Sequence, residues 1–287
     1  MGYEVQFSLA GLNLMLHMPH QIIINESFQP FVTEPIDKTD IHIRIYEEDR
    51  MDFPRTVPVC TKIPFCVYED DKGYYRVFHD HKENDTPYAA GRILSDTEEE
   101  IHYLTKCRMF FSESHNTFSH IALEDLLLRR NAVILHASYI DTMFGGILFS
   151  GPSGIGKSTQ ADLWCRYRNA EQINGDRPIL KREKSGWRAY GSPYAGSSKC
   201  WLNRSSQIRA IVILKQGTEC CIRKMDRAAA FRKLYEGMII NVWNDVYVER
   251  VLSIVEQLVT EVPVYQMICT PDKRAVDELE YMLKGEL

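Results

Sequence analysis

The residues best suited to chemistry form a glycine-rich stretch over 149–159, FSGPSGIGKST. It fits the pattern G-x-x-x-x-G-K-[ST], in which backbone N–H groups turn inward around phosphate oxygens at the positive end of a helix. Glycines are needed because a Cβ would obstruct that turn. The residues expected to bind a nucleotide are Gly151, Ser153, Gly154, Ile155, Gly156, Lys157, Ser158 and Thr159.

Two side chains of this loop have defined tasks in phosphoryl transfer. Lys157 is expected to reach the β- and γ-phosphates and to act as a catalytic residue, and the Ser158 hydroxyl is expected to bind Mg²⁺. The sequence therefore predicts ATP and Mg²⁺ as cofactors. The loop alone does not separate kinases from hydrolases or motors, because all of them hold the phosphates in the same way.

A candidate acid stands downstream in the segment NGDRP, where Asp176 heads an apolar run. No ordinary Walker B segment, with four apolar residues followed by aspartate, occurs after the loop, so Asp176 is the expected catalytic base or Mg²⁺ ligand. The alternative is an aspartate that only shapes an Asn-Gly-Asp turn. Lys199 and Arg204, in a later loop of small residues, are available as phosphate clamps.

A candidate histidine precedes the loop. Two apolar runs, over 132–140 and 146–150, flank a connection of hairpin length. If the turn centres on Met143, His136 falls opposite Ser150 and its imidazole reaches the transferring phosphoryl group. The alternative is a half-buried histidine with a backbone partner.

The elements that must position these residues change character along the chain. Residues 1–105 alternate polar and apolar positions in short runs, which predicts a mostly β N-terminal module. A helix is expected from 114 to 131. Residues 106–287 are expected to form the P-loop α/β domain with a mixed sheet: a helix from Lys157, a strand from Arg209, helices over 228–239 and 246–258, and a last strand, turn and helix from 262 onward.

The segment from Leu135 through NGDRPIL resembles the catalytic core of the HPr serine kinase/phosphorylase family, whose fold is similar to that of phosphoenolpyruvate carboxykinases. That family has a histidine at the position of His136 and an Asp-Asp-Arg run at the position of Gly175, Asp176 and Arg177. The chain resembles a divergent member, because the first acid is Gly175 here and the family's glutamate-containing RG-G signature is replaced by AGSSK. The resemblance implies an α/β fold, ATP and Mg²⁺.

The sequence leaves two functions open. The first is an ATP- and Mg²⁺-dependent phosphotransferase acting on a hydroxyl of a protein, peptide or small molecule, with Asp176 as the base or metal ligand and His136 supporting the phosphoryl group. The second is a nucleotide-dependent binding module whose phosphotransfer has lapsed, which the glycine at position 175 favours. Carboxykinase-type decarboxylation ranks last, because its additional metal ligands are not found.

Composition limits the partners. The chain has 34 basic and 39 acidic residues and a net charge of −5, without a long run of either sign, so neither a nucleic-acid nor a membrane-surface partner is expected. The first twenty residues lack a secretory pattern, and no apolar stretch is long enough to span a bilayer. We therefore expect a cytoplasmic protein; assembly into a homo-oligomer stays open.

Overall fold

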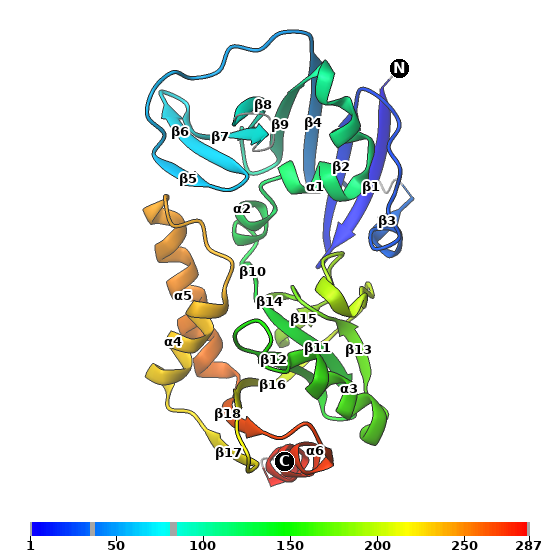
Figure 1. Ribbon diagram of the computed structural model, residues 1–287, viewed down its shortest axis with the longest axis vertical. Coiled ribbons are helices and arrows are strands. Elements are labelled where there is room, and N and C mark those ends of the chain that lie inside the picture. Colours follow the sequence, from blue (N-terminus) through cyan, green and yellow to red (C-terminus); the bar gives the residue numbers. More distant parts are fainter. Residues whose placement is uncertain (1, 35–37, 81–84, 286–287) are drawn as a thin grey trace. The chain divides into compact units, whose positions relative to one another are not determined.

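A computed structural model describes residues 2–34, 38–80 and 85–285 (Figure 1). The chain forms two compact units. The first contains Met1–Leu126 together with Val242–Asn244, and the second contains Leu127–Asn241 and Asp245–Leu287. The mixed α/β class, with a mostly β N-terminal part, is confirmed.

The first unit is built on a nine-stranded sheet in the order β3-β1-β2-β4-β9-β8-β7-β6-β5. Burial alternates along β4, where Ile41, Ile43 and Ile45 are buried and the residues between them are partly exposed, so one face of the sheet carries the core. The strands are β1 Tyr3–Leu9, β2 Leu12–Met18, β3 Val32–Thr33, β4 Ile41–Glu48, β5 Cys60–Lys62, β6 Phe65–Asp70, β7 Gly73–Asp80, β8 Thr86–Ile93 and β9 Glu98–Leu104, with 3₁₀ turns η1 Gln29–Phe31 and η2 Thr105–Ser112.

The prediction of a single helix over 114–131 is wrong, because the helix is interrupted. The structure has two helices, α1 Ser114–His120 and α2 Leu123–Leu128. At the break, the Arg76 guanidinium donates to the His120 carbonyl (2.9 Å) and the Glu99 carboxylate accepts from the Ala122 N–H (2.9 Å), while Arg76 and Glu99 pair at 2.7 Å. A buried ion pair thus satisfies backbone groups on both sides of the break.

The second unit has a sheet in the order β10-β14-β15-β16-β12-β11-β13, and β18 pairs with both β16 and β17. β12, β16 and β18 are mutually parallel, so their carboxyl ends meet at one edge. The strands are β10 Ala132–Ile134, β11 Ala137–Thr142, β12 Gly145–Ser150, β13 Glu171–Asn174, β14 Ile179–Glu183, β15 Gly186–Tyr190, β16 Ser205–Gln216, β17 Cys221–Lys224 and β18 Val264–Cys269.

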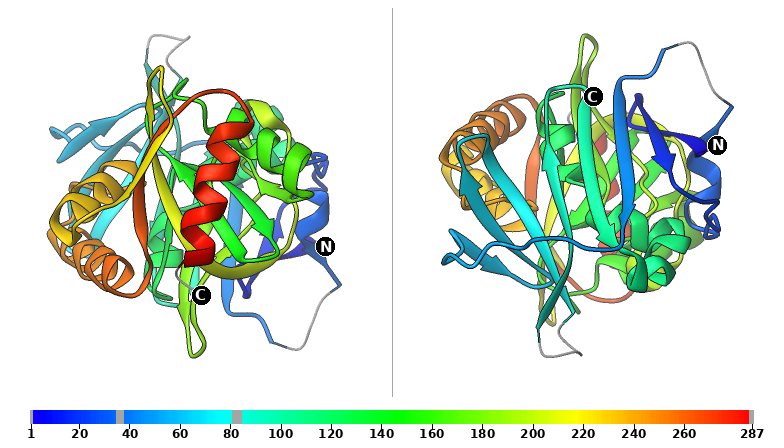
Figure 2. Two further views of the ribbon diagram at one scale, coloured as in Figure 1. Left: turned by 90° about the horizontal axis from the view of Figure 1, so that it is seen from below. Right: turned by 90° about the horizontal axis from the view of Figure 1, so that it is seen from above.

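Helices cover both faces of this second sheet (Figure 2). Phe149 of β12 and Val212 of β16 pack with α3 and α6, whereas Leu148 and Ile211, the neighbouring positions on the same strands, pack with α4 and α5. Both faces of the parallel strands are therefore buried, which is why they read as continuous apolar runs. The helices are α3 Lys157–Arg168, α4 Arg227–Gly237, α5 Asp245–Glu261 and α6 Lys273–Gly285, and η3 Gly196–Ser198 is a 3₁₀ turn.

None of the helices in the described ranges could span a bilayer. The longest, α5, has 17 residues and places Glu249, Arg250 and Glu256 on its exposed side. Its apolar side is buried against the sheet of the second unit.

Candidate functional site

The hairpin before the glycine-rich loop exists, but its predicted register is wrong by one residue. Ala137, not His136, pairs with Ser150, because the turn consists of Met143 and Phe144 and is followed by Gly145 with φ of +109°. The apolar run over 132–140 is also interrupted: β10 ends at Ile134 and β11 begins at Ala137. His136 therefore lies in the gap between two strands and not at a strand position.

The backbone of His136 is nonetheless fixed beside the loop. Its N–H donates to the carbonyl of Gly237, the last residue of α4, at 2.8 Å. Its carbonyl accepts from the Ser150 hydroxyl at 2.9 Å. The histidine is therefore held by α4 on one side and by the end of β12 on the other.

The glycines of the loop have backbone angles that favour glycine. Gly151, Gly154 and Gly156 have φ of +148°, +76° and +111°, which a residue with a Cβ rarely adopts, and α3 begins directly at Lys157. The Lys157 ammonium is buried inside the loop and donates to the carbonyls of Gly151 (3.0 Å) and Pro152 (3.2 Å). A cation thus lies within a ring of backbone at a helix N-terminus, where an anion is favoured.

The residues present fit Mg²⁺ that is bound together with a nucleotide. Ser158 and Thr159 lie exposed on the first turn of α3, so their hydroxyls are accessible. Mg²⁺ keeps several waters and takes one or two protein ligands alongside phosphate oxygens, and an accessible hydroxyl is a ligand of that kind. The described residues contain no cluster of three His, Cys, Asp or Glu side chains that could hold a metal without such phosphates.

Asp176 lies in a turn that the side chain of the buried Asn174 organises. The Asn174 carbonyl oxygen accepts from the N–H groups of Asp176 (3.1 Å) and Arg177 (2.8 Å), and its amide nitrogen donates to the Ser192 and Tyr194 carbonyls. Sequence reasoning did not assign this role to Asn174, although an Asn two residues before the acid is the signal of an Asx turn. The turn and the carboxylate are thus compatible: Asn174 shapes the backbone, and Asp176 is presented by it.

The structure brings Asp176 and His136 together. His136 Nε2 lies 3.2 Å from Asp176 Oδ1, and Arg177 Nε lies 3.4 Å from Asp176 Oδ2. Burial lowers the pKa of His136, the charges of Lys157 and Arg177 lower it further, and Asp176 opposes the shift. Burial likewise lowers the pKa of Lys157, again against the effect of Asp176. Lys157, Asp176 and Arg177 thus all act electrostatically on His136.

Packing explains why position 175 is a glycine and not an acid. A Cβ there would lie 2.6 Å from both the Ala195 carbonyl oxygen and Ser198 Cβ, because the loop containing η3 packs directly on it. A second carboxylate could not enter without displacing that loop. Of the proposed clamps, Arg204 instead pairs with Glu171 at the edge of the sheet, so it is not brought to Asp176.

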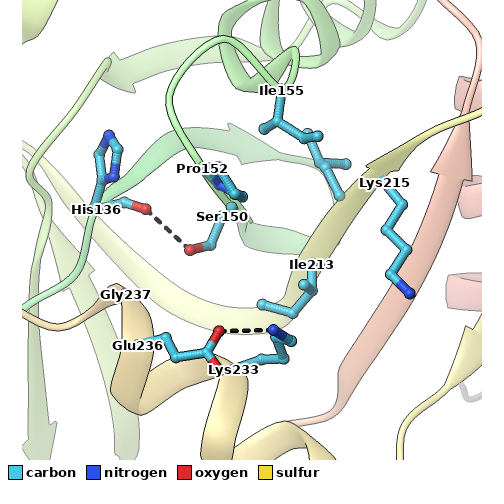
Figure 3. Close-up of a pocket in the computed structure, with 11 residues that line it drawn as sticks. His136, Ser150, Pro152, Ile155, Ile213, Lys215, Lys233, Glu236 and Gly237 are labelled. Atoms are coloured by element: carbon cyan, nitrogen blue, oxygen red, sulfur yellow. Dashed lines mark hydrogen bonds and ion pairs between the residues drawn. The ribbon is translucent and has the colours of Figure 1, made fainter.

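A cavity of about 340 Å³ adjoins the loop on the side of α4 (Figure 3). Its lining comes from His136, the end of β12 with the first turn of the loop, the carboxyl end of β16 and the last turn of α4. The residues are His136, Ser150, Gly151, Pro152, Ile155, Ile213, Leu214, Lys215, Lys233, Glu236 and Gly237. His136 therefore belongs both to the pair with Asp176 and to this cavity.

Comparisons with known proteins give limited information. No family model and no curated protein sequence matches the chain. Among solved structures, the chain is similar to the HPr(Ser) kinase/phosphatase from Coxiella burnetii, with 12% identity and a TM-score of 0.32 over 53% of this chain and 93% of that one. Likeness at this level gives no information about the reaction, so the function must be inferred from the residues themselves.

Proposed function

We propose that the chain is an ATP- and Mg²⁺-dependent phosphotransferase that phosphorylates a hydroxyl group. The observation that carries this proposal is the His136–Asp176 pair at 3.2 Å, next to the mouth of a loop that holds the buried Lys157. A nucleotide-binding loop needs only the backbone cradle and the lysine. A carboxylate and an imidazole held together beside it supply the proton acceptor that transfer to a hydroxyl requires.

Each residue has a separate role in the proposed reaction. The N–H groups of the loop and the Lys157 ammonium bind the phosphates, and Ser158 would hold Mg²⁺, which supplies charge neutralisation when it is bound. The acceptor oxygen forms a bond to the γ-phosphorus while the bond to the β,γ-bridging oxygen breaks, releasing ADP. The hydroxyl proton passes to Asp176, whose orientation His136 and Arg177 fix.

The alternative is a binding module that holds nucleotide without transferring phosphate. The packing at Gly175 favours it, because the Ala195 carbonyl leaves no room for a second acid. The retained pair of His136 and Asp176 favours catalysis, since binding alone does not require them.

The test compares the parent with Lys157→Ala. We expect the parent to bind ATP tightly only with Mg²⁺ and to turn it over, and we expect Lys157→Ala to lower affinity or turnover about ten-fold or more, because it removes the cation inside the loop. Isothermal titration and release of labelled phosphate measure both quantities. Mg²⁺-dependent binding without turnover, in the presence of cell extract as acceptor source, would establish the binding module instead.

A further inference from the structure

The cavity beside the loop shares His136 with the proposed reaction centre. His136 lines one part of it, and Lys215, at the carboxyl end of β16, lines another (Figure 3). Of the loop itself only Gly151, Pro152 and Ile155 contribute. The turn that begins α3 and carries the phosphate-binding Lys157 lies outside the lining, so the cavity adjoins the phosphate cradle without being part of it.

The walls of the cavity select a particular chemistry. Ile155, Ile213 and Leu214 give it an apolar side. On the α4 side, Lys233 and Glu236 form an ion pair at 2.7 Å, with 43% and 61% of their side chains exposed. The lining residues include two lysines and one glutamate besides the histidine, so their charges favour a ligand with an apolar body and a negative charge.

We propose that this cavity binds the phosphate acceptor, and that the acceptor is a small hydroxylated anion, not a protein. The inference rests on the proposed phosphotransfer. A volume of about 340 Å³ is at the lower end of the usual range for small-molecule sites, roughly 300–1,000 Å³. An acceptor seated there has its hydroxyl at His136, which lies 3.2 Å from Asp176, and its anionic group near Lys233.

The reaction then balances within the site. The hydroxyl oxygen of the bound anion bonds to the γ-phosphorus, ADP leaves with the bridging oxygen, and the proton goes to Asp176. The product is a phosphate ester of the anion, with more negative charge than the acceptor. Two lysines in the lining offset that charge while the product forms.

The experiment uses the full chain, γ-labelled ATP, Mg²⁺ and an extract of the cells from which the chain comes. The extract is divided by size at about 3 kDa, and the small fraction is divided again on an anion-exchange resin. Each part is then incubated with the chain and labelled ATP. We expect a labelled product, distinct from ATP and phosphate, to form with the retained, anionic part of the small fraction. In that part, Lys233→Glu should lower the labelling ten-fold or more, because it reverses a charge in the cavity, while the affinity for Mg²⁺-ATP changes less than two-fold.

The matched control is Arg232→Glu, which makes the same charge change at the neighbouring exposed position of α4 but does not line the cavity. It should label like the parent. Label in the macromolecular fraction, label in the unretained small fraction, or equal labelling by Lys233→Glu and Arg232→Glu would overturn the inference while leaving the phosphotransferase intact. A loss of Mg²⁺-ATP affinity in Lys233→Glu would assign the cavity to the nucleotide. Label in none of the fractions would contradict the phosphotransfer itself, and the inference with it.

Discussion

Two acid–base pairs, Arg76–Glu99 in the first unit and His136–Asp176 in the second, differ in what surrounds them. In the first unit, Glu99 and Arg76 have side chains that are 0% and 9% exposed. In the second, Asp176 and His136 are 26% and 38% exposed. The first pair lies in a core, and the second lies at the edge of a cavity.

The partners differ as well. Glu99 accepts from Arg76 and from the Ala122 N–H, and Arg76 also donates to the His120 carbonyl, so these groups serve the backbone at the break between α1 and α2. Around Asp176 the backbone is instead held by Asn174, which leaves the carboxylate to side chains only. Because Arg76 and Glu99 make hydrogen bonds to backbone groups, we interpret that pair as structural. Because Asn174 binds the backbone around Asp176, the Asp176 carboxylate is available for chemistry.

The largest expected effect is on the structural pair. Arg76→Met leaves the Glu99 carboxylate buried without its counterion, and we expect the free energy of unfolding of the first unit to fall by about 3–5 kcal/mol. Burial already raises the pKa of Glu99 to about 7, against the opposing effects of Arg76 and the Ala122 N–H. Without Arg76 that pKa must rise further. The stability lost at pH 8 should therefore be partly regained toward pH 5, where Glu99 takes up a proton. Urea unfolding followed by circular dichroism measures the loss at both pH values.

The double variant Arg76→Met/Glu99→Met is the control for this prediction. It removes both charges, so it should be more stable than Arg76→Met alone. Labelling activity per folded molecule should match the parent in both variants. A loss of activity at unchanged stability would mean that this pair also serves the reaction.

The next effect concerns the pair in the second unit. Asp176→Asn keeps the shape of the side chain but cannot take a proton, so we expect the transfer rate to fall roughly 10²-fold, the usual scale for a positioned base. ATP affinity should stay within a few-fold if the carboxylate acts on the acceptor, and should fall with it if the carboxylate mainly holds Mg²⁺. Stopped-flow transfer rates and titration calorimetry separate these outcomes. A rate equal to that of the parent would remove Asp176 from the mechanism and favour the binding module.

Much of the second unit follows from local sequence. The helix at Lys157 and the helices near 228–239 and 246–258 occur close to their predicted bounds, because helix periods and the glycine pattern are local properties. The strand expected from Arg209 also occurs, but it begins earlier, at Ser205. The hairpin register was missed by one residue because it depends on whether the turn has two residues or three. The break after His120 was missed because Arg76 and Glu99, which satisfy it, lie on distant strands.

In the candidate site, too, local features are predictable from the sequence and features that depend on distant contacts are not. The glycine-rich loop is predictable because its conformation depends on closely spaced glycines with positive φ. The cavity is not, since Lys233 and Glu236 come from a helix that the sheet brings to the loop. The absence of an acid at position 175 was visible in the sequence, but its cause, contact with the Ala195 carbonyl, depends on how a later loop packs.

The smallest expected effect is a change in the pKa of His136, which belongs to the pair in the second unit. Burial lowers its pKa, Lys157 lowers it further, and Asp176 opposes the shift. The folded-state pKa therefore lies below the unfolded value, so the contribution of His136 to stability is present above the unfolded pKa and is lost as the pH falls through the folded pKa. Removal of each neighbour should move the pKa in opposite directions: Lys157→Met should raise it, and Asp176→Asn should lower it further. The imidazole proton shift of His136, followed by NMR from pH 4 to 8, measures the three values, with His136→Ala identifying the signal. If neither variant moves the pKa, the three side chains do not share one electrostatic site, and His136 is a half-buried histidine held by the Gly237 carbonyl and Ser150 alone.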